Sequence, residues 1–169
     1  MDVQFELNGH RVQTTVRPDE TLFETLRRLG CSSVKCGCDT TNCGLCTVFV
    51  DDLATLSCAY PAPRIHQHCV KTLEFFEQEA LAFGAFLADQ GADQCGFCNP
   101  GMIMCLFALE QDLKLQPGDP LPSAADIRQY LAGNLCRCSG YVGQTRAIQA
   151  YLTHKYDLCP SGGRQDESK

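Results

Sequence analysis

The chain has 169 residues, 13 of them cysteines, with a formal net charge of -6 and a sequence pI near 5.1. This length allows two small domains and leaves no room for a large catalytic domain. The acidic balance excludes nucleic-acid binding, because a nucleic-acid-binding protein must neutralise phosphates with clustered Lys and Arg, and the sequence has no such cluster.

The N-terminus carries no basic region followed by an apolar core, and no stretch approaches the length of a membrane span. The odd number of cysteines also argues against a secreted disulfide framework, whereas a reducing cytosol favours metal ligation by thiols. We therefore expect a cytoplasmic protein.

The N-terminal part has the alternation of a small mixed sheet. Apolar and polar residues alternate over residues 3–7, Asn8-Gly9 predicts a type I′ hairpin turn, and residues 12–16 continue the alternation on a returning strand. A helix follows, and Thr21 with Glu24 forms a capping box at its start.

A second hairpin is predicted beyond the helix, with one strand at residues 47–50 and its partner at residues 53–57. Two hairpins around one helix indicate a ubiquitin-like or ferredoxin-like grasp.

After about Thr72 the apolar period changes from two residues to about 3.6, which predicts a helical bundle. Asn99 is the expected cap of a helix that begins at Pro100, and Ser123 the expected cap of the next helix. Residues 158–169 predict a disordered tail. The expected helical faces are Phe76, Ala80, Phe83 and Leu87; Ile127 and Leu131; and Ile148, Tyr151 and Leu152.

Eight of the cysteines form two groups of four, which is the number of thiolates that a 2Fe-2S cluster needs. The first group has the x4-x2 spacing of plant-type ferredoxins, with its fourth cysteine on a later segment. A small chain with two such clusters would pass electrons along. The first group is Cys38, Cys43, Cys46 and Cys58, and the second is Cys95, Cys98, Cys136 and Cys138.

Three functions from different classes fit these groups: an electron-transfer subunit of a larger enzyme, a free-standing ferredoxin-like carrier, and a zinc-stapled interaction module. Zinc would account for tetrahedral thiolate sites, but not for the ferredoxin-like spacing of the first group between hairpins. The sequence has no G-x-G-x-x-G nucleotide signature, which favours a subunit whose partners supply the other cofactors.

The cysteine motifs together resemble the small iron-sulfur subunit of the xanthine dehydrogenase and aldehyde oxidase family of molybdenum hydroxylases. The resemblance spans about residues 3–155, and its motifs occur in the order and spacing of the family. The segments that carry it are Val34-Lys35-Cys36-Gly37-Cys38, Cys43-Gly44-Leu45-Cys46-Thr47-Val48, Leu56-Ser57-Cys58, Gln94-Cys95-Gly96-Phe97-Cys98-Asn99-Pro100-Gly101-Met102 and Gly133-Asn134-Leu135-Cys136-Arg137-Cys138-Ser139-Gly140-Tyr141.

The resemblance implies an α+β protein with a 2Fe-2S cluster in each domain: a plant-type ferredoxin-like β-grasp over residues 1–74 and a four-helix bundle over residues 75–157. It also implies a large subunit with a molybdopterin-bound molybdenum and, usually, an FAD subunit. Electrons would run from molybdenum to the cluster of the helical domain, then to the ferredoxin-like cluster, then to the flavin or another acceptor. The substrate, a purine, an aldehyde or an N-heteroaromatic compound, would bind the large subunit.

The resemblance further implies two contacts with the pterin of the molybdenum cofactor. The glutamine before the third motif and the second thiolate of the Cys-Arg-Cys pair take this role in the family, which places it on Gln94 and Cys138. An amide offers both a donor and an acceptor to the pterin edge.

Three residues depart from the family pattern. Thr41 and Phe75 stand where the family usually has glycine, and Gln144 stands where an apolar residue is common. Because a β-branched residue disfavours positive φ, we expect another loop path between Cys38 and Cys43, with Asn42 in the left-handed region.

The remaining cysteines are expected not to be ligands. Cys36 lies off the x4 spacing, and Cys31, Cys69 and Cys105 are expected as small buried hydrophobes, with Cys159 in the tail. Arg137 either offsets the negative thiolates or forms an interface salt bridge. The histidines have no ligand spacing with the cysteines and are expected to be solvated or packed: His10, His66, His68 and His154.

Overall fold

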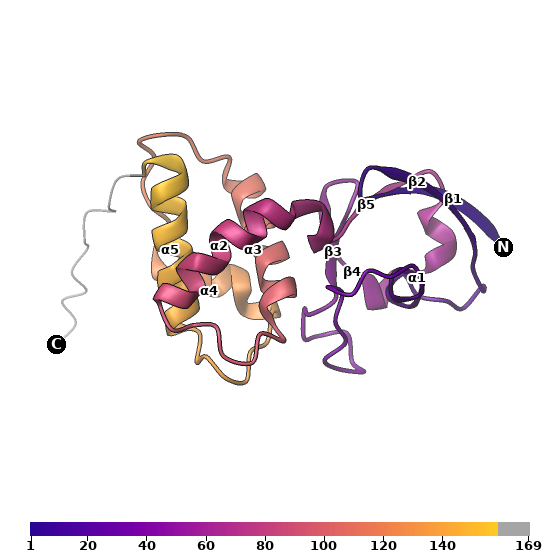
Figure 1. Cartoon of the computed structure of the whole chain (residues 1–169), viewed down its shortest axis with the longest axis horizontal. Helices are drawn as coiled ribbons and strands as arrows, with labels where there is room; N and C mark the ends of the chain where they lie inside the picture. Colours follow the sequence, from indigo (N-terminus) through magenta and orange to yellow (C-terminus); the bar gives the residue numbers. More distant parts are fainter. Residues whose placement is uncertain (159–169) are drawn as a thin grey trace.

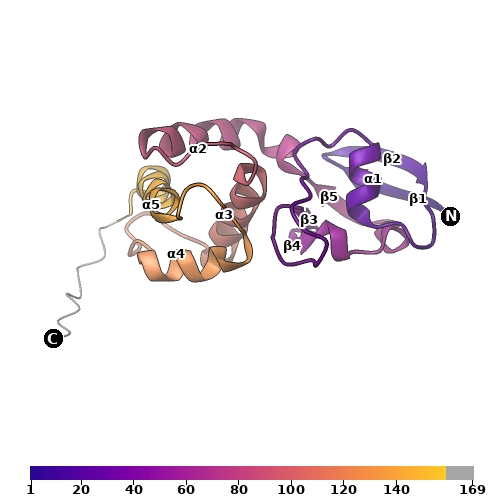
Figure 2. The ribbon, with the colours of Figure 1, turned by 90° about the horizontal axis from the view of Figure 1, so that it is seen from below.

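The computed structural model describes residues 1–158, and in it the chain folds into two units that lie end to end (Figures 1 and 2). The N-terminal unit is a mixed sheet with one α-helix packed against it, and the C-terminal unit consists of α-helices. The α+β class predicted from the sequence is confirmed.

The sheet has five strands in the order β2-β1-β5-β3-β4, with β1 and β5 parallel and the other neighbours antiparallel. This is the β-grasp expected from the sequence, although the three-residue strand β5 was not predicted. The elements of this unit are β1 (Asp2–Leu7), β2 (His10–Thr15), α1 (Leu22–Arg28), β3 (Thr47–Val50), β4 (Leu53–Leu56), the 3-10 turns η1 (Ser57–Ala59) and η2 (Ala62–Ile65), and β5 (Cys69–Lys71).

Local sequence signals explain both hairpins and the start of α1. Asn8 and Gly9 both have positive φ, at 51° and 82°, so the first turn is the predicted type I′ turn. The Asp51-Asp52 turn between β3 and β4 has the same left-handed backbone, at 48° and 64°. The capping box of Thr21 and Glu24 is present, and the inward face of β1 packs with α1 in the core of this unit.

The helical unit packs around one apolar core that contains the predicted apolar faces of its helices. Ser123 caps its helix through a capping box with Asp126, as expected. The next helix upstream begins one residue earlier than predicted, so that Cys98 is the cap and Asn99 is the first helical residue. The elements are η3 (Leu73–Phe76), α2 (Glu77–Asp89), α3 (Asn99–Leu113), α4 (Ala124–Tyr130), η4 (Leu131–Gly133) and α5 (Val142–Tyr156).

The helical unit extends at least one residue beyond the end that the sequence predicted. Leu158, which the sequence placed in a disordered tail, is only 4% exposed and belongs to the core of the helical unit. An apolar residue directly after the helix can fold back onto the core, which composition alone does not indicate. Residues 159–169, including Cys159, lie outside the described residues.

Two side chains of the 3-10 turn η3, Phe76 and Glu74, contact the sheet unit, and Phe76 also contacts the helical unit. The Phe76 ring stacks edge-on against Phe49 of β3 at 5.9 Å and packs at 5.1 Å against Phe107 of α3. Glu74 accepts hydrogen bonds from the backbone N–H and the hydroxyl of Ser33 at 2.8 and 2.5 Å. Phe75 has ordinary backbone angles, so its substitution for glycine introduces no left-handed strain here.

None of the described helices has the length and apolar character needed to cross a membrane.

Candidate metal centres

The first cysteine group lies where the loop between α1 and β3 meets the turn η1. Cys43 and Cys46 are buried, at 5% and 3% exposure, and Cys38 and Cys58 are half-buried. The backbone N–H and hydroxyl of Ser57 both donate to the Cys46 carbonyl, at 3.2 and 2.7 Å, which holds η1 beside the loop. The structure therefore places Cys58 beside the loop that carries Cys38, Cys43 and Cys46.

Thr41 itself adopts the left-handed conformation, at φ 56°, so the expectation that Asn42 would take it was wrong. In this loop path, backbone N–H groups on both sides of Thr41 point at one sulfur. The N–H groups of Asn42 and Thr40 donate to Cys38 and lower the pKa of this thiol to about 6. The loop thus favours the thiolate that a metal needs.

Gly37 allows the chain to pass close to the same group. A Cβ at this position would lie 2.4 Å from Leu45 Cδ1 and 3.3 Å from Cys43 Sγ. A larger residue there would have to shift the Leu45 side chain and would crowd Cys43 Sγ, a candidate ligand.

The second cysteine group joins the α2–α3 connection to the η4–α5 connection. Cys95 Sγ and Cys138 Sγ are 3.6 Å apart and exposed, whereas Cys98 is buried beside Cys136. Burial, followed by the neighbouring Cys136, raises the pKa of Cys98 to about 12. The four predicted thiols are again together.

Ser139 is a functional residue that our sequence reasoning missed. Its backbone N–H and hydroxyl both donate to Cys136 Sγ, at 3.3 and 3.2 Å. Burial alone would raise the pKa of Cys136, but these donors lower it to about 7. The signal was a serine directly after a Cys-x-Cys pair, since hydroxyls and N–H groups often bond cluster sulfurs.

Within each group the thiols contact one another in pairs. The pairs of the first group are Cys38 with Cys43 and Cys46 with Cys58, and those of the second are Cys95 with Cys138 and Cys98 with Cys136. Among residues 1–158 no three metal-binding side chains converge as a single ion would require. Two pairs of thiolates match the four ligands that the two irons of a 2Fe-2S cluster need.

The two groups face each other across the junction of the units. A cavity of about 400 Å³ is lined by Cys38 and Cys43 on one side and by all four cysteines of the second group on the other. Leu135 N–H donates to the Cys43 carbonyl at 2.8 Å, and Asn134 Nδ2 donates to the Gly44 carbonyl at 3.2 Å. Hydrogen bonds between the units thus fix the distance between the two groups.

Cys31 is buried, as expected, and Cys36 is exposed with its thiol directed to the Cys38 carbonyl at 3.4 Å. Cys105 on α3 is half-buried and contacts Thr47 of β3. None of these three cysteines completes a cysteine group in the described part of the chain.

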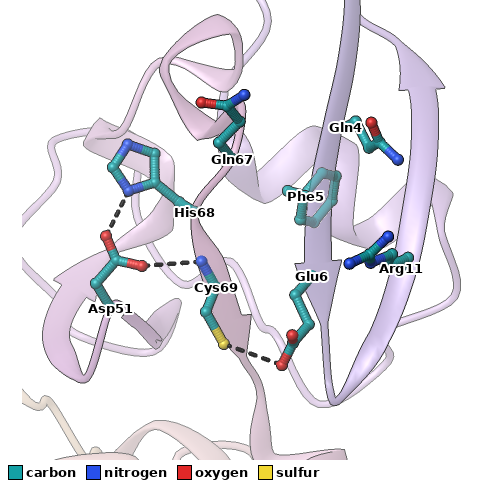
Figure 3. Close-up of a pocket in the computed structure, with 8 residues that line it drawn as sticks. All are labelled: Gln4, Phe5, Glu6, Arg11, Asp51, Gln67, His68 and Cys69. Atoms are coloured by element: carbon teal, nitrogen blue, oxygen red, sulfur yellow. Dashed lines mark hydrogen bonds and ion pairs between the residues drawn. The ribbon is translucent and has the colours of Figure 1, made fainter.

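Cys69 lines a separate hollow on the sheet unit, shown in Figure 3. Its thiol contacts Glu6 at 3.4 Å, and its backbone N–H donates to Asp51, which also binds His68. Burial and the Glu6 carboxylate raise the pKa of this thiol. Cys69 is half-buried, and His68 is partly exposed and bound to Asp51.

Gln94 and Arg137 are exposed beside the second group. Arg137 lines the cavity between the units and forms no ion pair with any residue in the range 1–158. The Gln94 side chain has no hydrogen-bond partner among residues 1–158 and is exposed.

Comparison with known proteins identifies both units. The family described as 2Fe-2S iron-sulfur cluster binding domain matches residues 5–66, and the family described as 2Fe-2S binding domain matches residues 72–149. A xanthine dehydrogenase iron-sulfur-binding subunit from Escherichia coli O157:H7 is 40% identical over 146 residues, which cover 82% of this chain and 86% of that protein.

Two further similarities extend over most of the chain. The nicotinate dehydrogenase small FeS subunit from Eubacterium barkeri is 34% identical over 161 residues, covering 93% of this chain and 96% of that protein. One chain of quinoline 2-oxidoreductase from Pseudomonas putida 86 superimposes with a TM-score of 0.79 at 28% identity, covering 92% of this chain and 96% of that one.

Proposed function

This chain belongs to the xanthine dehydrogenase and aldehyde oxidase family of molybdenum hydroxylases, as a small iron-sulfur subunit that transfers electrons, and we propose which residues hold its two 2Fe-2S clusters. Cluster 1 is held by Cys38, Cys43, Cys46 and Cys58. Cluster 2 is held by Cys95, Cys98, Cys136 and Cys138. The observation that carries this assignment is the contact of the eight thiols in four pairs.

Each thiol pair binds one iron. The chain prepares these sites with N–H and hydroxyl donors that favour the thiolates of Cys38 and Cys136. When bound, a cluster accepts and releases one electron at a time.

The exposed edge of cluster 2 faces the large molybdopterin-binding subunit. Support comes from Cys95 and Cys138, which are exposed, and from two apolar side chains beside them, Phe97 and Leu135, each 47% exposed. Apolar surface around a redox centre suits a protein interface. Gln94 and Cys138 lie on this edge and contact the pterin of the molybdenum cofactor.

When the clusters are bound, cluster 2 would accept electrons first, and cluster 1 would pass them on to an FAD subunit or another acceptor. The facing arrangement of the two groups around one cavity supports this order. The ferredoxin-like domain spans residues 1–74, and the helical domain begins at residue 75, inside η3, and includes the buried Leu158 beyond the expected end at residue 157. Free thiols at all described cysteines suit a reducing, cytoplasmic location.

The test combines metal analysis with paramagnetic resonance of the reduced protein. We expect about four irons and about four labile sulfides per chain. Cys43→Ser or Cys46→Ser should remove one of two reduced-state signals, and Cys98→Ser or Cys136→Ser the other. Loss of both signals in all four folded variants would contradict the assignment.

Purification under native conditions tests the partner. The chain should co-purify with a much larger polypeptide that contains molybdenum. A brown, stable, isolated chain would instead support a free-standing ferredoxin-like carrier.

A further inference from the structure

Gln144 is a buried amide that faces a proposed ligand of cluster 2. It lies in the first turn of α5 and is only 1% exposed. Its Nε2 is 3.6 Å from Cys98 Sγ, which is a hydrogen-bonding distance for sulfur. The amide therefore contacts the buried member of the group, Cys98, whereas Cys95 and Cys138 are exposed.

Packing alone does not explain an amide at this position. Polar side chains are costly to bury unless they form hydrogen bonds, and an apolar residue would fill the same space without that cost. The helix neighbours Ala147 and Ile148 are buried and apolar, as is usual for this face. A buried hydrogen-bond acceptor would explain an amide N–H donor at this position, and the acceptor in the structure is Cys98 Sγ.

The chemistry of the ligand determines which end of the amide faces it. A thiolate bound to iron has no proton, so its sulfur only accepts hydrogen bonds. The Nε2–H group of Gln144 can donate to that sulfur, whereas Oε1 cannot. Cys98 is 6% exposed, so water does not replace this donor.

We propose that Gln144 is a positioning residue that raises the reduction potential of cluster 2 by donating an N–H hydrogen bond to Cys98 Sγ. This inference rests on the assignment of Cys98 to cluster 2. Reduction adds one negative charge to the cluster, and a donor to a ligand sulfur stabilises the more negative state. The hydrogen bond thus favours arrival of an electron at cluster 2.

Cluster 1 provides an internal reference, because Gln144 has no contact with the first cysteine group. Raising the potential of cluster 2 alone shifts the distribution of electrons between the clusters toward cluster 2. The chain therefore sets, through one side chain, how readily cluster 2 accepts an electron and how readily it passes the electron on.

The experiment is a reductive titration of the holo-protein, with each reduced cluster followed by its paramagnetic resonance signal. The variant is Gln144→Met, which keeps the length of the side chain and removes the N–H donor. The ratio of reduced cluster 2 to reduced cluster 1 at a fixed potential should fall about twofold to tenfold, the range expected for one hydrogen bond. The hyperfine coupling of one exchangeable proton near cluster 2 should also disappear.

Gln149→Met is the matched control. Gln149 lies on the same helix, and its Nε2 donates to the Pro122 carbonyl at 3.2 Å instead of to a thiol. This variant should keep the wild-type ratio. An equal fall in this ratio in both variants would show that any substitution in α5 changes it, and would overturn the proposal.

Two further outcomes separate this proposal from the ligand assignment. If Gln144→Met keeps both clusters and the wild-type ratio, the proposal is overturned while the assignment stands. If Cys98→Ser keeps the cluster 2 signal, the assignment itself fails. Gln144→Ile is a second variant with an apolar residue, and loss of cluster 2 in both Gln144 variants would show a role in assembly and overturn the tuning role.

Discussion

The backbone N–H of Leu135 donates a hydrogen bond of 2.8 Å to the carbonyl oxygen of Cys43. Cys43 belongs to the first thiol group, and Leu135 directly precedes Cys136 of the second. Covalent bonds and one hydrogen bond therefore connect the proposed ligands of the two clusters. Because electrons tunnel better along bonded paths than across gaps, we propose that this contact is a route between the clusters.

Gly44 lets the two units approach closely enough for this contact. Its φ is 72°, and a Cβ there would lie 2.1 Å from the Gly133 carbonyl oxygen. Gly44→Ala should therefore lower the free energy of unfolding for two reasons. Left-handed strain should contribute about 1–2 kcal/mol, and overpacking should contribute about 1–3 kcal/mol more. The thermal midpoint of the holo-protein checks the loss, and rapid reduction should show slower transfer between the clusters.

Gly118→Ala separates the two costs. Gly118 has a φ of 87°, but a Cβ there would meet nothing within 4 Å. This variant should show the strain alone and keep wild-type transfer between the clusters. Equal destabilisation by the two variants would mean that the units are not in close contact at Gly44.

The sequence predicted the elements whose causes are local. The type I′ turn at Asn8-Gly9 and the capping box at Thr21 depend on neighbouring residues, and both are present. The strand β5 and the burial of Leu158 depend on distant partners, so periodicity did not reveal them.

The same distinction holds for the candidate site. Cysteine spacing suggested two groups of four thiols, and the structure places Cys38 beside Cys43 on one short loop. The pairs of the second group join two connections that lie far apart in the sequence, which spacing alone does not show. Spacing also could not predict that Ser139 and Gln144 would donate to ligand sulfurs, since these contacts depend on how α5 packs. The sequence did not predict the left-handed conformation of Thr41, because the prediction used the general preference of β-branched residues for negative φ. That preference takes no account of the N–H groups of this loop that donate to Cys38.

Thr41 carries a strain that glycine would relieve. A left-handed backbone costs an L-residue about 1–2 kcal/mol, and glycine returns roughly 0.5–1 kcal/mol of this as chain entropy. Thr41→Gly should therefore stabilise the loop by about 0.5–1 kcal/mol. The cluster 1 absorbance should be lost about two to five times more slowly in denaturant.

Thr40→Gly is the control for this prediction. Thr40 lies in the same loop without positive φ, and its hydroxyl is 3.0 Å from Asn42 Oδ1. Glycine should bring no gain there. A longer cluster lifetime in Thr40→Gly than in Thr41→Gly would contradict the strain argument.

The exposed thiol of Cys36 lies two residues from Cys38, so the two compete as the first ligand of cluster 1. The Cys36 side chain is directed to the Cys38 carbonyl, and Cys38 is the one that pairs with Cys43. Cys36→Ser should keep full iron content, whereas Cys38→Ser should lose one cluster, or about half the iron. Iron analysis with paramagnetic resonance decides this, and the reverse result would reassign the ligand.

Gln94 is exposed directly before Cys95, and we propose that its amide contacts the molybdenum cofactor of the large subunit. Gln94→Ala removes no proposed ligand and should keep both clusters. Loss of one ordinary hydrogen bond, worth roughly 0.5–1.5 kcal/mol, should slow reduction of cluster 2 by substrate several-fold without abolishing it. The rate is measured by rapidly mixing the whole complex with substrate and following the bleaching of the clusters.

Gln90→Ala, at the end of α2, is the control, and its cluster 2 should be reduced at the wild-type rate. Wild-type bleaching and full cofactor content in Gln94→Ala would show that the contact is dispensable and that Gln94 serves only the turn before Cys95.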